Sequence, residues 1–490
     1  MNLLWNSWIP VRTLVGRRCV RPSEVASPWV EALDWPRADL NLACLEFLIG
    51  LVAAADPPED AEDWEVRREP DMERLSARLE ALAPAFDLLG DGPRFLQELG
   101  GLEGEPNPPD MLFIDSAGAN AVKKNADLMV HGGRYPALDL PTAAMALYLL
   151  QSHAPSGGAG NRTSLRGGGP MVTLVDPGTG RLWDMIWANV PYRPQGEPYT
   201  FPWMRPARTS ERGEVLPPDA GDPLDAFFAM PRRLWLVAEG DVVTGVIQRP
   251  WGGNYLGWVH PLTPYYRVKE GAELLPVHPR PGRFSYRNWL GVVMASTEQN
   301  RQLRQRAKAV ETYEDRLPLA ARRGASLLVG GWAMNNMQPM DFTLSRQPLL
   351  PLNNLGQARV RGMIEASELL WGVLRSTLRL VVGEESALDA LREDWFTATE
   401  ETFDRLVRHA GDRAVGADWL AALRRKALSM FDREALSGLT ERPIEDVQLI
   451  VKARQILQQS FAGFGKPGAE TFRLLELPLP ERKARAEVQV

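Results

Sequence analysis

The chain has 490 residues, a formal net charge of −6, 44% hydrophobic residues and 24% charged residues. This composition is typical of a globular protein and excludes a disordered chain, a coiled coil and a disulfide scaffold. The negative charge also argues against a protein that coats nucleic acid through bulk charge. Only two cysteines are present, Cys19 and Cys44, which excludes a multi-cysteine zinc site; we expect no metal and no other cofactor.

The N-terminal residues lack the basic segment and the small-residue cleavage site of a signal peptide. The longest apolar stretch, residues 42–55, is interrupted by Glu46 and is shorter than the roughly 20 residues that cross a membrane. We therefore expect a cytoplasmic protein without a membrane partner.

The proline content changes near residue 355. All but four of the 40 prolines lie in residues 1–354, and proline breaks helix interiors, so this part is predicted to be a large mixed α/β domain with many loops. Residues 355–490 show apolar side chains at helical spacing. They predict an all-α C-terminal four-helix bundle, and thus an α+β protein with its domain boundary after residue 354. The four helices are expected at 355–382, 384–410, 418–437 and 440–461.

Local patterns predict several elements in the first part. Helices are expected at 39–55, 72–83 and 142–152. The proline-rich segment 191–223 predicts a surface loop anchored by aromatic side chains. Strands are expected at 171–175, 234–238, 242–248 and 265–268.

The sequence contains no recognisable catalytic signature. A phosphate loop, a dinucleotide fingerprint and a Gly-x-Ser-x-Gly elbow are all absent, and no two histidines have metal-ligand spacing. We therefore assign no catalytic residue and expect a protein that is not an enzyme. The alternative is a hydrolase or nucleotide-using enzyme with an unrecognised active site.

A glycine-rich segment spans residues 154–170. Glycines expose backbone N–H groups and allow a polyanion to approach closely, and Arg162 and Arg166 could pair with phosphate. The same composition is typical of a flexible surface loop, which remains the alternative.

A second segment, residues 330–339, places two asparagines and two methionines beside a glycine pair. Amide groups can contact base edges, and apolar side chains can push between base steps. The alternative here is a β-turn with an asparagine in the left-handed conformation.

These segments occur in an order and spacing that resemble the CasA family, the large subunits of type I-E CRISPR surveillance complexes (Cascade). The resemblance covers nearly the whole chain. Besides the glycine loop and the apolar helix at 39–55, it rests on Asn2-Leu3-Leu4, Trp8-Ile9-Pro10-Val11, Gly330-Gly331-Trp332 and Asn335-Asn336.

The resemblance implies a DNA-reading subunit that performs no catalysis itself. Such a subunit probes double-stranded target DNA for the short protospacer-adjacent motif, largely from the minor groove, and helps to open the duplex for the guide RNA. The implied partners are therefore target DNA, the CRISPR RNA ribonucleoprotein with its other subunits, and the helicase-nuclease that docks on this subunit.

The resemblance also implies specific DNA contacts. Arg249 is the candidate basic residue, with Gln248 as the fallback, and either Met337 or Gln338 pries the base pairs apart. Ala159 stands where a glycine is expected. The full set of expected DNA contacts is Ser156, Gly157, Gly158, Ala159, Gly160, Arg249, Asn335, Asn336, Met337 and Gln338.

A further loop, about residues 115–133, resembles one that inserts toward the guide RNA and its capping subunit. Phe113 stands at the start of this loop, and Lys123 and Lys124 lie within it. These three residues are the expected contacts with guide RNA or a partner subunit. A basic pair on a solvated loop is the alternative.

Overall fold

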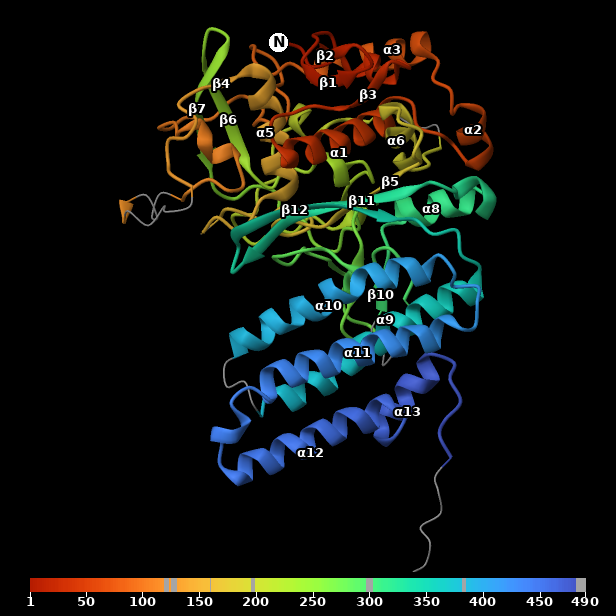
Figure 1. The fold of residues 1–490 in the computed structure, drawn as a ribbon. Coiled ribbons are helices and arrows are strands. Elements are labelled where there is room, and N and C mark those ends of the chain that lie inside the picture. Colours follow the sequence, from red (N-terminus) through yellow and green to blue (C-terminus); the bar gives the residue numbers. More distant parts are fainter. Residues whose placement is uncertain are drawn as a thin grey trace, which may run out of the picture. The chain divides into compact units, whose positions relative to one another are not determined.

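The computed structural model describes residues 1–118, 123–124, 130–158, 160–194, 199–296, 303–380 and 385–481. Over these ranges the chain combines helices and short strands and then becomes helical toward its C-terminus, so the predicted α+β fold class is confirmed. The chain forms two compact units (Figure 1).

The two units are not divided at a single point of the sequence. Unit 1 comprises Met1–Arg283 and Thr297–Leu349, and unit 2 comprises Phe284–Ser296 and Leu350–Val490. The expected boundary after residue 354 thus lies close to the second junction. The segment Phe284–Ser296 departs from the expectation, because its aromatic side chains are buried among the C-terminal helices.

A long apolar helix, α1 (Ala38–Ala55), forms the centre of unit 1. It packs against α5 (Leu140–His153), α6 (Leu182–Asn189) and α7 (Asp225–Phe228). Its length and composition would suffice to cross a membrane, but 78% of its apolar window is buried inside the protein, as in a core helix. Shorter helices of this unit are α2 (Ala61–Val66), α3 (Met72–Glu80) and α8 (Lys308–Arg316).

The described part of unit 1 contains four three-stranded antiparallel sheets, with strand orders β2-β1-β3, β10-β8-β9, β12-β11-β5 and β4-β7-β6. The predicted helices correspond to α1, α3 and α5, and the predicted strands correspond to β5, β6, β7 and β8. The strands are β1 (Ile9–Thr13), β2 (Gly16–Val20), β3 (Val30–Leu33), β4 (Leu138–Asp139), β5 (Val172–Asp176), β6 (Arg233–Glu239), β7 (Val242–Arg249), β8 (Tyr265–Arg267), β9 (Leu275–Pro276), β10 (Leu303–Gln305), β11 (Ser326–Asn335) and β12 (Gln338–Pro348).

The proline-rich segment 191–223 is a loop with buried aromatic anchors, as predicted. Tyr199, Phe201 and Trp203 are buried, and the Phe201 and Trp203 rings stack with centroids 4.7 Å apart. The Trp203 indole also donates a hydrogen bond to the Ala85 carbonyl. These anchors fix the path of a loop that has little regular structure of its own.

Glu46 interrupts the apolar sequence of α1 and lies at the centre of a buried ionic cluster. Its Oε1 atom is 2.7 Å from His153 Nε2, and its Oε2 atom is 2.7 Å from Arg166 Nη1 and 4.0 Å from His260 Nε2. Burial opposes ionisation of Glu46, but the charge of Arg166 and the contacts with His153 outweigh it and lower its pKa to about 2. Glu46 is therefore ionised at neutral pH and retains Arg166 in the core.

The described part of unit 2 contains the four predicted helices and one more. The additional helix, α13, follows a glycine-rich joint, and Pro467 lies in its first turn, where proline is tolerated. The sequence analysis missed it because it ended the helical pattern near Phe461. The helices are α9 (Asn354–Leu378), α10 (Glu385–Val407), α11 (Val415–Ala435), α12 (Ile444–Phe461) and α13 (Gly465–Leu474).

Two aromatic residues attach Phe284–Ser296 to unit 2. The Tyr286 hydroxyl is hydrogen-bonded to Ser367 Oγ at 2.9 Å and to Thr399 Oγ1 at 2.8 Å, and its ring stacks on Phe403. Trp289 packs edge-on against the same phenyl ring. Both aromatic side chains are 1% exposed, so this segment contributes to the hydrophobic core of the bundle.

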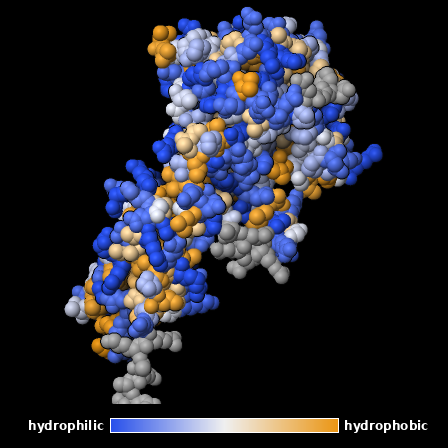
Figure 2. All heavy atoms as spheres, turned by 90° about the vertical axis from the view of Figure 1, so that its right-hand side faces the viewer, coloured by the Kyte–Doolittle hydropathy of each residue, from blue (hydrophilic) through white to orange (hydrophobic). Residues whose placement is uncertain are grey.

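The surface of each unit is mostly hydrophilic on the face that Figure 2 shows, with apolar side chains in small groups. Such scattered apolar residues are normal on a globular protein.

Acidification is expected to weaken the ionic cluster. Burial and the Arg166 charge lower the pKa of His260 well below its usual 6.5, so below that pH the unfolded chain binds a proton that the folded chain excludes. Glu46 acts in the same direction at lower pH, because its stabilising ionisation is lost as the pH falls from 4.5 toward 2. Calorimetry should show a steeper loss of thermal stability between pH 6.5 and 4.5 for the wild type than for His260→Gln. Equal slopes would contradict this account.

Candidate nucleic-acid interface

The hairpin of β11 and β12 ends in a two-residue turn formed by Asn336 and Met337. Their φ angles are 48° and 63°, the signature of a type I′ turn, and Asn335 and Gln338 form the last strand pair. The turn with a left-handed asparagine, predicted as the alternative, is therefore confirmed. The same turn places the expected wedge tip, Asn336, Met337 and Gln338, and the expected DNA contact Asn335 together at an exposed end of the hairpin.

The hairpin tip lies against residues 167–169, the second glycine run of the 154–170 segment. A Cβ atom on Gly168 would lie 2.8 Å from Pro155 Cα, 3.0 Å from Met334 Sδ and 3.1 Å from Met337 Sδ. Glycine at position 168 therefore permits the start of the glycine loop and the two methionines of the hairpin to meet. The structure thus brings together the two segments that the sequence analysis singled out separately.

Arg166 anchors this second glycine run in the core. Its side chain is 2% exposed, and besides its ion pair with Glu46 it donates hydrogen bonds to Thr263 Oγ1 and the Ser152 carbonyl. The Gly169 amide donates to the His153 carbonyl at 3.0 Å, which fixes the other end of the run. The suggestion that Arg166 could pair with phosphate is therefore wrong, because its guanidinium is buried and forms an ion pair with Glu46.

The exposed part of the glycine loop is a tight turn over residues 156–161. Gly157 N donates to the Asn161 carbonyl at 3.3 Å, and Asn161 N donates to the Gly158 carbonyl at 3.1 Å. Ser156, Gly157 and Gly158 are exposed, and Gly158 has a φ of 93° with open space where a Cβ would stand. Ala159 lies outside the described residues.

Gly160 faces inward rather than toward a ligand. A Cβ atom on this residue would lie 2.6 Å from Pro250 Cβ, so the glycine is required for packing against the chain that follows β7. The expected contact of Gly160 with DNA through its backbone stays a prediction.

The C-terminal end of β7 presents two predicted residues on opposite sides, as consecutive strand residues must. Gln248 Nε2 donates to Asn161 Oδ1 at 2.7 Å, so Gln248 lies under the glycine loop. The Arg249 side chain is exposed but lies beside Gly104, with Nη2 3.0 Å from the site of a Cβ there. The fallback, Gln248, is thus the residue that the fold brings to the loop.

Arg232 lies directly beneath the glycine loop and was missed by the sequence analysis. Its side chain donates from Nε to the Arg162 carbonyl at 2.8 Å and from Nη2 to the Pro155 carbonyl. The residue is 6% exposed, and burial lowers its pKa to about 10. The adjacent pair Arg232-Arg233 was the only signal in the sequence, and it does not reveal which arginine is buried.

Arg162 and Trp251 complete the support of the loop. The Arg162 guanidinium lies over the indole of Trp251, 5.4 Å from the ring centroid, and donates to Ser210 Oγ at 2.9 Å. Trp251 N in turn donates to the Gly160 carbonyl at 2.7 Å. Arg162 therefore holds the loop against Ser210 and Trp251.

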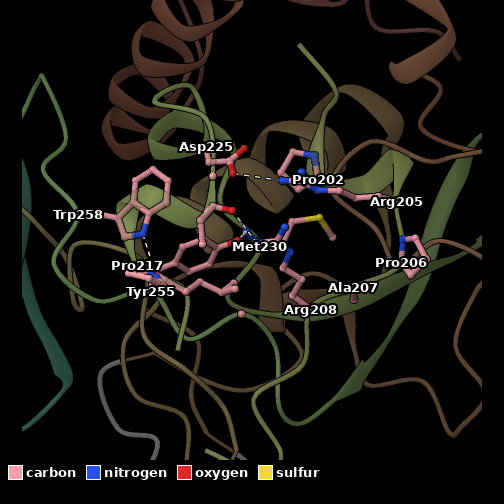
Figure 3. Close-up of a pocket in the computed structure, with 14 residues that line it drawn as sticks. Pro202, Arg205, Pro206, Ala207, Arg208, Pro217, Asp225, Met230, Tyr255 and Trp258 are labelled. Atoms are coloured by element: carbon pink, nitrogen blue, oxygen red, sulfur yellow. Dashed lines mark hydrogen bonds and ion pairs between the residues drawn. The ribbon is translucent and has the colours of Figure 1, made fainter. Parts of the chain in front are cut away.

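A small cleft, partly open to solvent, is lined by residues between Pro202 and Trp258 (Figure 3). Tyr255, Met230 and Trp258 form apolar walls, and Arg205 and Arg208 lie at its side. The carboxylate of the cleft, Asp225, is already bonded to Tyr199 and Arg205. Both oxygens of this carboxylate are therefore engaged.

The expected guide-RNA contacts are not assembled on one surface. Phe113 is 2% exposed, and its ring lies 4.5 Å from that of Tyr135 and under the Arg37 guanidinium. It therefore anchors the base of the loop and is not available to a partner. Lys123 and Lys124 are exposed, and most of the loop around them lies outside the described residues.

Over the described ranges, no group of three or more histidine, cysteine, aspartate or glutamate side chains is arranged to hold a metal ion. In the Glu46 cluster the positive charge comes from Arg166.

Comparison with solved structures shows the same fold in CRISPR-associated proteins. CasA from Thermus thermophilus matches with a TM-score of 0.72 and 19% identity, over 94% of this chain and 98% of that chain. Cse1 from Thermobifida fusca matches with a TM-score of 0.71 and 17% identity, over 97% and 98%. A chain of a CRISPR RNA-guided surveillance complex matches with a TM-score of 0.70 and 17% identity, over 94% and 99%.

The chain thus shares its fold with CRISPR-associated proteins. The sequence profile of one family in this class, CRISPR-associated protein Cse1, matches residues 2–430. The chain belongs to the Cse1 family, and the resemblance stated from its sequence is confirmed.

The left-handed backbone at the hairpin tip gives a stability prediction. A non-glycine residue in this conformation costs about 1–3 kcal/mol, and a β-branched residue fits it worst. We expect Met337→Gly to leave the free energy of unfolding unchanged or raise it by up to about 1 kcal/mol, and Met337→Val to lower it by about 1–2 kcal/mol. Urea denaturation measures both. An equal effect of the two substitutions would argue against the observed turn.

Proposed function

We propose that this chain is the large subunit of a type I-E CRISPR RNA-guided surveillance complex. In this role it recognises the protospacer-adjacent motif in double-stranded DNA, helps to open the duplex for R-loop formation, and recruits the helicase-nuclease. Membership of the Cse1 family and the similarity to a chain of a surveillance complex support the subunit role. The recruitment of the nuclease rests on the family resemblance alone.

The observation that carries the DNA-reading role is the meeting of the glycine loop and the hairpin tip at Gly168. The exposed amides of Asn336 and Gln338 can donate hydrogen bonds to the acceptors of the minor groove. Between them, the exposed Met337 can insert between base steps, as apolar wedges of minor-groove proteins do. Readout from this groove is degenerate, so we expect several related motifs to be accepted.

The enzyme alternative finds little support in the chain. The cleft of Figure 3 has its carboxylate engaged, and the most perturbed histidine, His260, is buried in the Glu46 cluster. A thermal-shift screen with divalent metals and nucleotides tests this alternative, because a tightly bound cofactor would raise the unfolding temperature. A large stabilisation would favour the enzyme.

Replacement of the hairpin tip tests the wedge. In a reconstituted complex, Asn336→Ala/Met337→Ala/Gln338→Ala should slow R-loop formation on supercoiled target DNA by about tenfold or more, because unstacking costs a few kcal/mol per base step. The control is a target with mismatched bases beside the motif, on which the variant should approach the wild-type rate. Unchanged rates on fully paired DNA would contradict the wedge assignment. The single variants Met337→Ala and Gln338→Ala show which of the two residues separates the base pairs.

A charge placed on the glycine loop tests its contact with DNA. Gly158→Asp should weaken motif-dependent DNA binding by about tenfold while leaving guide-RNA binding intact, because the open space above Gly158 directs the carboxylate toward the DNA. The matched control is Gly240→Asp, in the turn between β6 and β7, where φ is also positive and the space is also open. Equal losses in both variants, measured by electrophoretic mobility shift, would indicate backbone strain instead.

A further inference from the structure

Arg232 is a buried cation without a counter-charge. No carboxylate in the described ranges forms an ion pair with it; its side chain bonds backbone carbonyls of the glycine-rich segment, and Gln151 bonds its main chain. A buried arginine is normally paired, because transferring its charge from water is costly. Arg166 illustrates the paired arrangement within the same loop system, where Glu46 neutralises it.

Gly157 allows the guanidinium of Arg232 to pack closely against the backbone of the glycine loop. A Cβ atom on Gly157 would lie 2.8 Å from Arg232 Nη1, 2.9 Å from Asn161 Cβ and 3.0 Å from Arg232 Nη2. Nη2 and Nε are bonded to carbonyls, whereas no partner for Nη1 occurs in the described part of the chain. The charge of Arg232 therefore lies directly beneath the exposed turn, and one of its guanidinium nitrogens has no acceptor among the described residues.

Further donor groups lie on the turn above Arg232. Ser156 and Gly158 are exposed, and neither main-chain N–H has a hydrogen-bond acceptor among the described residues. The Ser156 hydroxyl adds another donor group, and no acidic side chain lies in residues 154–162. Successive backbone N–H groups beside a cation form the kind of concavity that binds oxyanions.

We propose that Ser156, Gly157 and Gly158, with Arg232 beneath them, form a binding site for one phosphodiester group of the DNA backbone. The inference rests on the proposed function, since it assigns the chemical group that the glycine loop contacts. Phosphate contacts position a protein on the duplex and carry no sequence information, whereas the hairpin tip contacts the base edges. A bound phosphate would supply the negative charge that Arg232 does not receive from any carboxylate in the described residues.

Two substitutions remove the site in different ways. Arg232→Gln removes the charge and retains donors for the two carbonyls. Gly157→Ala retains the charge but places a Cβ atom 2.8 Å from Nη1 and 2.9 Å from Asn161 Cβ, so the guanidinium must move away from the turn. The backbone of Gly157 is not in the left-handed region, so the substitution adds no strain of that kind. A folding defect in the first variant therefore leaves the second as an independent test.

The control is Arg316→Gln. Arg316 resembles Arg232, because it is largely buried, donates to the Val190 carbonyl at 2.9 Å and has no ion-pair partner within the described ranges. It lies beneath Trp64 and Tyr192 rather than beneath a glycine. Its replacement reports the cost of losing a buried arginine that is not part of the site.

The experiment measures DNA affinity of the assembled complex against salt concentration for targets with and without the motif. We expect Arg232→Gln and Gly157→Ala to reduce the slope of log K against log salt by about one, the loss of one phosphate contact, while the ratio of affinities for the two targets stays unchanged. Arg316→Gln should keep the wild-type slope. A neutral methylphosphonate at the contacted position should weaken wild-type binding and have no additional effect in the two variants.

Distinct outcomes separate this inference from the proposed function. Wild-type slopes in both Arg232→Gln and Gly157→Ala would overturn the phosphate site. A changed slope in Arg316→Gln as well would also overturn it, because the effect would then be structural. If the wild-type complex showed no preference for a motif, the proposed function itself would fail, whatever the slopes of the variants.

Discussion

The ion pair between Glu46 and Arg166 is the interaction on which the proposed DNA-reading surface depends. A carboxylate in the middle of an apolar helix is costly unless a cation satisfies it, and the cation here comes from the glycine-rich segment. Because Arg166 is drawn into the core, Gly167 to Gly169 are held against β11, and Gly168 meets the methionines of the hairpin. The position of an exposed hairpin tip is thus set by a charge pair that no solvent reaches.

Arg166 and Arg232 are both buried arginines that support the glycine-rich segment, but they have different electrostatic roles. Arg166 is neutralised internally and fixes the chain, whereas Arg232 supports the loop through carbonyls and keeps its charge uncompensated. This contrast also reconciles a DNA-binding role with the overall charge of the protein. A net charge of −6 limits non-specific attraction to DNA, while a single buried cation beneath a glycine can act locally.

Sequence reasoning singled out the glycine loop and residues 330–339 but could not place several of the expected contact residues. Composition cannot show that Gly160 packs against Pro250 while Gly158 faces open space, because both are glycines in one turn. Strand alternation could have shown that Gln248 and Arg249 point to opposite sides, but only the fold shows which side holds the loop. Phe113 was expected at a partner surface, yet two arginines and Tyr135 enclose its ring.

The sequence by itself determined the fold class, the helical C-terminal region and the turn at the hairpin tip, because these depend on proline content, helical periodicity and local backbone preferences. It also carried the family resemblance. Only the tertiary structure decided that Phe284–Ser296 belongs to unit 2, that Glu46 captures Arg166, and that Arg232 lies beneath Gly157. These depend on contacts between residues far apart in the chain, and burial, which sets the energy of each charge, is a property of those contacts.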